Sequence, residues 1–139
     1  MRARFYALAF SCLVFTLAGC GGDGIPRAAV KGTVTYDGKP IETGVIMFIP
    51  SDVSPIALKI TDGIYDSESD VNDRRGAPIG DCQVQIFGDK PSGKIVTDIT
   101  TGQKVEEFIQ FIPPKYNVNS ILTVTVEAGD QNIDFSLDN

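Results

Sequence analysis

Three acidic side chains form the first group in this 139-residue sequence whose spacing suggests chemistry. Asp66, Glu68 and Asp70 alternate along one polar stretch, and an amide and another carboxylate follow directly. Oxygen ligands at such spacing suit Ca²⁺. An EF-hand loop requires glycine at its sixth position, whereas Val71 stands there in this chain. A solvated acidic loop is therefore the plainer interpretation, and a Ca²⁺ site is the alternative.

Nucleophilic and zinc chemistry find little support in the composition. The sequence contains no histidine and no tryptophan, which removes Ser–His and Cys–His pairs and the usual zinc sites. It also lacks a G-x-S-x-G elbow and a phosphate-binding glycine loop. The neighbouring carboxylates of Glu106 and Glu107 could in principle act as acid and base, but acids in polar turns are usually just solvated. We therefore expect a protein that is not an enzyme.

A cysteine near the N-terminus has a more specific setting. Arg2 and Arg4 precede an apolar run at 5–17, which ends in Leu17-Ala18-Gly19-Cys20. The run has 13 residues, whereas a membrane-spanning helix needs about 20, so a membrane helix is the weaker alternative. A basic start, a short apolar stretch and a small-residue exit are typical of a secretory signal.

The four residues Leu17, Ala18, Gly19 and Cys20 resemble the lipobox of bacterial lipoproteins. The resemblance implies cleavage before Cys20 and covalent lipid on its sulfur, and two or more acyl chains hold a protein stably in a membrane. Three glycines follow within four residues and predict a flexible linker. We therefore expect a signal peptide at 1–19, a lipidated cysteine and linker at 20–28, and a single domain at 29–139. The protein would be exported and anchored to a bacterial membrane, on its periplasmic or cell-surface side.

The charge of the mature chain limits its partners. Removing residues 1–19 takes away two arginines and leaves 120 residues with 10 basic and 18 acidic side chains, a net charge of about −8. Such a chain repels phosphate backbones, so we expect no nucleic-acid partner. As a partner we expect an envelope protein or a glycan, and we expect a monomer. Cys82 is the one cysteine left for the domain, and burial is the usual fate of a free cysteine.

Strand signals recur along the rest of the chain. Asp37-Gly38 and Asp62-Gly63 are strong hairpin-turn signals. The last two apolar runs predict a final hairpin, and the continuously apolar run 44–49 predicts a strand covered on both faces. Long polar segments at 66–76 and 88–107 predict loops, the second with one edge strand. The predicted strands are 29–36, 44–49, 56–61, 64–65, 81–87, 95–99, 121–127 and 132–137.

Several of these segments also resemble a known family. VKGTVTYDGKPIETGVIMFIP, TDGIY, GAPIGDCQVQI and IPPKYNVNSILTVTVEAGDQNIDFSL resemble the carboxypeptidase regulatory-like domains of small bacterial lipoproteins. The resemblance covers residues 29–138 and implies an all-β fold, a single transthyretin-like, Greek-key β-sandwich of about seven strands. It also implies an envelope module without catalytic residues. Cys82 departs from the family pattern, which has tyrosine there.

Together these observations predict a lipid-anchored, non-enzymatic envelope protein with a binding or structural β-sandwich. The alternative is a Ca²⁺- or glycan-binding module of the same fold. Loops on a rigid scaffold commonly carry binding sites, and long ones are usually functional or disordered. We therefore expect any partner to be held by the segments 66–76 and 88–107.

Overall fold

The described part of the chain is all-β, with one short 3₁₀ turn. The computed structural model describes residues 24–71 and 73–139, so the predicted signal peptide, lipobox and lipidated Cys20 lie outside the described residues. The elements are β1 (Arg27–Ala28), β2 (Val30–Tyr36), β3 (Lys39–Pro40), β4 (Thr43–Pro50), β5 (Ile56–Thr61), β6 (Ile64–Asp66), β7 (Ala77–Pro78), β8 (Gly80–Thr97), β9 (Lys104–Gln110), η1 (Pro114–Tyr116), β10 (Leu122–Val126), β11 (Gln131–Asn132) and β12 (Phe135–Leu137).

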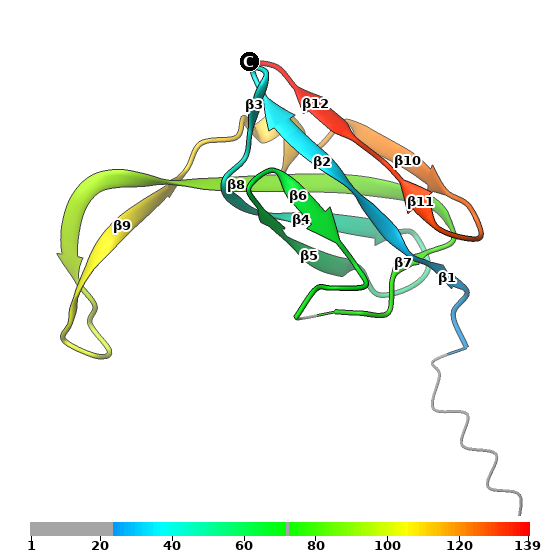
Figure 1. Ribbon diagram of the computed structural model, residues 1–139, viewed down its shortest axis with the longest axis horizontal. Coiled ribbons are helices and arrows are strands. Elements are labelled where there is room, and N and C mark those ends of the chain that lie inside the picture. Colours follow the sequence, from blue (N-terminus) through cyan, green and yellow to red (C-terminus); the bar gives the residue numbers. More distant parts are fainter. Residues whose placement is uncertain (1–23, 72) are drawn as a thin grey trace, which may run out of the picture.

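Most strands join one continuous hydrogen-bonded sheet. Its order is β10-β8-β4-β5-β6-β2-β11, with β3 and β12 also pairing with β2, and β9 pairing with β8. Pairing is antiparallel except where β2 meets β11 and β12, which run parallel to it. Strands β1 and β7 form a separate two-stranded sheet. In Figure 1, β2 and β12 cross obliquely over the much longer β8. The C-terminal half of β8 extends away from the rest of the molecule together with β9.

Alternating apolar residues build a single core under these strands. The inward positions of β5 are Ile56, Leu58 and Ile60, and every second side chain is exposed. Inward residues of β2, β4, β8 and β12 join the same cluster. Three aromatic rings, those of Phe48, Tyr65 and Phe135, stand in a row with centroids 6.0 and 6.5 Å apart.

Two tight turns connect the strands as the sequence predicted. Asp37 and Asp62 both adopt positive φ, at 47° and 51°, and each is followed by a glycine with positive φ. Consecutive positive φ angles match the turn type that Asp-Gly favours in hairpins. The hairpin predictions at Asp37-Gly38 and Asp62-Gly63 are therefore confirmed.

The C-terminal segment is held against β2 by a close backbone approach. A Cβ at Gly32 would collide with the carbonyl group of Ile133, so only glycine fits this position. Next to it, the Asp134 carboxylate accepts hydrogen bonds from the backbone N–H of Thr33 at 2.7 Å and from its hydroxyl at 2.9 Å. These bonds lower the pKa of Asp134. The phenol of Tyr65 donates to the carbonyl of Ile133 at 2.6 Å from the core side.

Two sequence predictions about strands are wrong. The runs 121–127 and 132–137 do not form a hairpin, because β10 pairs with β8 whereas β11 and β12 pair with β2. The intervening turn carries the chain from one end of the strand order to the other. Strand β4 is not covered on both faces either, since Ile46 and Phe48 are buried whereas Val45 is exposed.

Candidate interaction surface

The second half of β8 and all of β9 form a ribbon that projects from the molecule. We call residues 89–110 the arm, and Figure 1 shows it extending to the left, away from the N-terminal side. Its antiparallel register runs from Asp89 opposite Gln110 at the base to Thr97 opposite Lys104 near the tip, with a bulge between Pro91 and Ile95. The prediction of a loop with one edge strand over 88–107 is therefore wrong, since both sides of this segment are strand.

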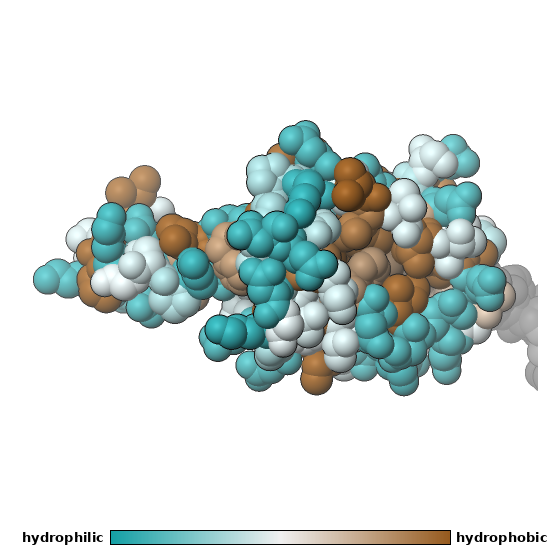
Figure 2. Space-filling view, turned by 90° about the horizontal axis from the view of Figure 1, so that it is seen from above, coloured by the Kyte–Doolittle hydropathy of each residue, from teal (hydrophilic) through white to brown (hydrophobic). Residues whose placement is uncertain are grey.

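The arm carries six of the twelve exposed large apolar side chains among the described residues. In an antiparallel pair, residues directly opposite each other lie on the same face. Pro91, Phe108 and Ile95 therefore lie on one face, and Val96 and Val105 lie on the other. Figure 2 shows hydrophobic side chains standing out along the arm at the left. The exposed ones are Ile95 at 64%, Val96 at 38%, Ile99 at 101%, Val105 at 40%, Phe108 at 54% and Ile109 at 43%.

Local hydrogen bonds hold the ribbon together in the absence of a core of its own. At the tip, the Asp98 carboxylate accepts from the backbone N–H groups of Thr100 and Thr101 at 2.7 and 2.8 Å. These bonds lower the pKa of Asp98. At the bulge, the Ser92 hydroxyl donates to the Glu107 carboxylate at 2.6 Å. An isolated two-stranded hairpin is marginally stable in water, so these contacts matter for the shape of the arm.

Aromatic packing fixes the base of the arm to the body. The ring of Phe111 meets that of Tyr36 edge-on, with centroids 5.7 Å apart, and the ammonium of Lys90 lies 5.4 Å from the Phe111 centroid. A shallow hollow of about 230 Å³ lies beside this contact, between the arm base and the segment 39–42. The arm therefore leaves the body at a defined position and angle.

The acidic segment 66–76 folds back on the body, and carboxylates in it accept hydrogen bonds from nearby backbone N–H groups. Asp70 is buried and accepts from the backbone N–H groups of Lys59 at 2.6 Å and Asp73 at 3.1 Å. Asp66 accepts from the N–H of Glu68 at 2.8 Å. No group of three or more His, Cys, Asp or Glu within 24–71 and 73–139 is arranged to hold a metal ion. Ca²⁺ binding by Asp66, Glu68 and Asp70 stays a prediction, which a melt in Ca²⁺ against EDTA would test.

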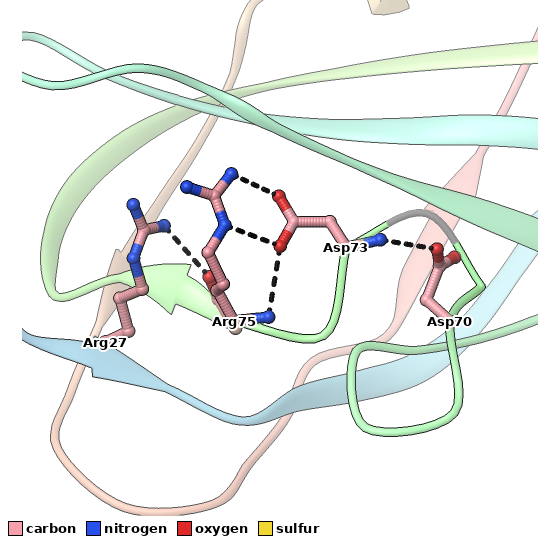
Figure 3. Close-up of polar contacts among 5 residues, drawn as sticks. Arg27, Asp70, Asp73 and Arg75 are labelled. Atoms are coloured by element: carbon pink, nitrogen blue, oxygen red, sulfur yellow. Dashed lines mark hydrogen bonds and ion pairs between the residues drawn. The ribbon is translucent and has the colours of Figure 1, made fainter. Parts of the chain in front are cut away.

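Arginine side chains make further contacts at the C-terminal end of the segment 66–76 (Figure 3). The Arg75 guanidinium donates to the Asp73 carboxylate at 2.9 and 2.7 Å, which lowers the pKa of Asp73. The Arg27 guanidinium donates to the carbonyl of Gly76 at 3.2 Å and links β1 to the end of the loop. The segment 66–76 is therefore a tied-down part of the body, which sets it apart from the projecting arm.

Cys82 lies in the core, as the sequence predicted. The residue is 2% exposed, and its thiol is 3.7 Å from the carbonyl oxygen of Pro78. Burial, followed by the charge of Asp81, raises the pKa of the thiol. A protonated, buried thiol is a poor nucleophile. Beside it, an open groove of about 630 Å³ runs across residues 49–51 at the end of β4, 81–83 near the start of β8 and 123–125 in the middle of β10.

The predicted anchor residues Leu17, Ala18, Gly19 and Cys20 lie outside the described residues. In residues 24–71 and 73–139, no helix is long and apolar enough to cross a membrane. The sequence did not predict a ribbon, although the apolar residues at 95, 96 and 105 lie within the predicted polar segment and those at 108 and 109 follow it directly.

Comparisons with known proteins add little to this geometry. No family model matches the chain, and no curated protein does either. Among solved structures, a crystal structure of a 9R-lipoxygenase from Cyanothece PCC8801 aligns with 80% of this chain at 14% identity and a TM-score of 0.35. The chain spans only 16% of the length of that lipoxygenase chain. A likeness at this level carries no argument about fold or function.

Proposed function

We propose that this protein is a lipid-anchored, non-enzymatic module of the bacterial envelope that binds a partner through the arm. One observation carries the proposal: the arm projects from the body and exposes apolar side chains on both of its faces. Exposed apolar patches on soluble proteins usually mark interaction sites. The core cluster of the described residues contains no arm residue, so the arm is not needed to bury the body's apolar residues.

The proposed body is a transthyretin-like, Greek-key β-sandwich of the carboxypeptidase regulatory-like kind. Two features support this finer description. The C-terminal β12 runs parallel to β2, and strands from both ends of the strand order contribute to one core. Such a body is a rigid scaffold, and rigid scaffolds commonly present binding segments at their ends.

The proposed anchor rests on the sequence Leu17-Ala18-Gly19-Cys20. We expect Cys20→Ser to abolish lipid attachment, because it removes the sulfur at the cleavage point. Fractionation of cells should find this variant uncleaved or in the soluble fraction, whereas the wild type requires detergent for release. A variant that still requires detergent in the same way would contradict the anchor.

Replacing the arm tests the binding role. Residues 90–109 are exchanged for a short Gly/Ser turn, which keeps Asp89 opposite Gln110 at the base. The melting temperature should stay near wild type, because no arm residue belongs to the core cluster. Cross-linking in intact envelopes should lose the adduct that the wild type forms. As a matched control, a body variant, Val118→Ser, removes an apolar side chain that is 69% exposed and should keep the adduct. An arm-less protein with the same adducts as wild type would overturn the proposed function.

A further inference from the structure

The outer edge of β9 is open for further strand pairing. Within the described residues, β9 pairs with β8 alone. At one end the N–H of Asp98 donates to the carbonyl of Gln103 at 2.8 Å, and at the other the N–H of Phe111 donates to the carbonyl of Gly88 at 3.0 Å. Backbone groups alternate in direction along a strand, so odd-numbered residues of β9 face β8. The even-numbered residues, Lys104 and Glu106 among them, direct their N–H and C=O groups to the open edge.

The two edges of the arm differ in how they are protected. The β8 edge carries Pro91, which has no N–H, and the bulge that follows it. Proline and bulges are the devices by which proteins block unwanted edge pairing. Strand β9 has neither over Lys104–Gln110. An uninterrupted edge with exposed apolar neighbours is a template for pairing with another strand.

We propose that this edge pairs antiparallel with β9 of a second copy, about a two-fold axis at Val105. This deepens the proposed function, on which it rests, by naming the partner that the arm binds. It also replaces the monomer expected from the sequence. A two-fold axis is the commonest symmetry of protein dimers and lets one surface pair with itself.

Charge selects the register of this pairing. Centred on Val105, it places Lys104 opposite Glu106 of the second copy twice, and opposite charges across a strand pair are favourable. Centring on Glu106 or on Glu107 would set a carboxylate against its own copy, which is unfavourable. Centring on Phe108 would place Glu107 against the apolar Ile109. The register at Val105 also makes Lys104 and Glu106 a hydrogen-bonded pair, in keeping with their outward backbone groups.

Apolar burial follows from the same register. Val96 lies opposite Val105 in the arm, so self-pairing makes a continuous row of four valines across four strands. Both residues are partly exposed in the single chain, at 38% and 40%. This contact is smaller than a standard stable interface. Anchoring both copies in one membrane raises their effective concentration, so a small interface suffices.

The proposal is tested with the full chain in its own membrane. Val105→Cys places a thiol on the two-fold axis, in a non-hydrogen-bonded pair whose Cβ atoms are close enough for a disulfide. Under mild oxidation we expect about tenfold more disulfide-linked dimer than from Val118→Cys, an exposed position on the body. Wild type reports the background from the native cysteines. Equal cross-linking of the Val105 and Val118 variants would overturn the proposal.

Charge reversal sharpens the test in the Val105→Cys background. Either Lys104→Glu or Glu106→Lys sets like charges opposite each other at both ends of the pairing, and should lower the dimer yield by about tenfold. The double variant Lys104→Glu/Glu106→Lys restores opposite charges across the axis and should recover the yield. Within one chain, these residues lie opposite Thr97 and Ile95, which are uncharged, so the arm itself tolerates the exchange.

Failure of the pairing and failure of the proposed function are distinguishable. If the Val105 variant gives no excess dimer but the arm-less protein loses its envelope adduct, self-pairing is wrong and the arm binds something else. If both the dimer and the adduct are unaffected by the arm, both proposals fall. Shielding of Val96→Cys from a water-soluble maleimide by phosphatidylglycerol vesicles, at protein dilutions that give no dimer, would overturn self-pairing in favour of lipid contact.

Discussion

Strand β8 runs through two environments, and its two halves differ sharply. In the body, Cys82, Val84 and Ile86 alternate with polar residues and are at most 2% exposed. In the arm, the consecutive residues Ile95 and Val96 are 64% and 38% exposed. The first half is flanked by β4 and β10. Beyond Asp89, which still pairs with β4, the second half pairs with β9 alone among the described residues. One continuous strand is thus part of a core and part of a ribbon without one.

The body half of β8 contributes residues that stabilise the fold, whereas the arm half exposes residues to solvent. Residues with few buried contacts contribute little to global stability and open locally at low cost. Substitutions in the body half should therefore act on the free energy of unfolding, and those in the arm should act on association. Paired variants of the same residue type, one in each region, make this contrast measurable.

The largest expected difference in the free energy of unfolding is between alanine substitutions of two phenylalanines, one in the body and one in the arm. Phe48 is fully buried between the strands of the body, whereas Phe108 is 54% exposed in the arm. Truncating a buried phenylalanine to alanine costs about 3–5 kcal/mol of stability, whereas a surface change costs about 0.5 kcal/mol or less. Urea denaturation of Phe48→Ala and Phe108→Ala should show this difference. A similar loss in both would mean that the arm shares the body's core.

The two halves of β8 should also differ in thiol reactivity. Cys82 is buried and its pKa is raised, so it should react with a thiol reagent only through opening of the body. A thiol introduced by Val96→Cys is on the exposed ribbon. We expect labelling of Cys82 under native conditions to be slower by about a hundredfold or more. Equal rates would show that the body half opens as readily as the arm.

The body could be predicted from the sequence because its strands have one buried face. The prediction 56–61 coincides with β5, and 29–36 and 64–65 agree with β2 and β6 to within a residue. The alternation of apolar and polar residues predicts which side chains face the core, and the Asp-Gly pairs predict the turns. The final hairpin was wrong because neighbours in sequence were assumed to pair. Instead, β12 pairs with β2, far away in the chain, directly after the close approach of Ile133 to Gly32.

The arm could not be predicted in the same way. Neither of its faces is buried, so its apolar residues do not alternate with a period of two, and Pro91 and Gly93 signal a loop. The segment is a strand because β8 continues out of the sheet and β9 pairs with it. For the candidate site, the spacing of the acids at 66–70 suggested Ca²⁺ ligands. In the structure, the Asp70 carboxylate accepts hydrogen bonds from two backbone N–H groups of the body.

Two aspartates provide the third contrast. Asp70 in the body and Asp98 at the arm tip each accept two backbone N–H groups, but only Asp70 is buried. Removing the Asp70 carboxylate leaves two partly buried N–H donors without their acceptor, at a cost of about 1 kcal/mol each, while water replaces the exposed acceptor at Asp98. Thermal unfolding should therefore show a clear loss of melting temperature for Asp70→Ala and little or none for Asp98→Ala. The reverse order would contradict the division into body and arm.

The smallest effect is a pH dependence that belongs to the body alone. The pKa values of Asp134 and Asp98 are both lowered by hydrogen bonds to their carboxylates. A lowered pKa in the folded state gives stability above the unfolded value, about 3.9, and loses it as pH falls through the folded value. Asp134 ties the C-terminal segment to β2, so the melting temperatures of wild type and Asp134→Ala should differ at pH 6 and converge below about pH 4.

Asp98→Ala is the matched control, because its carboxylate orders only the arm tip. Its melting temperature should follow that of wild type across the same pH range. Opening of the ribbon does not require the body to unfold. If Asp98→Ala instead converged with wild type only in acid, as expected for Asp134→Ala, the arm would unfold together with the body. The two halves of β8 would then form one cooperative unit.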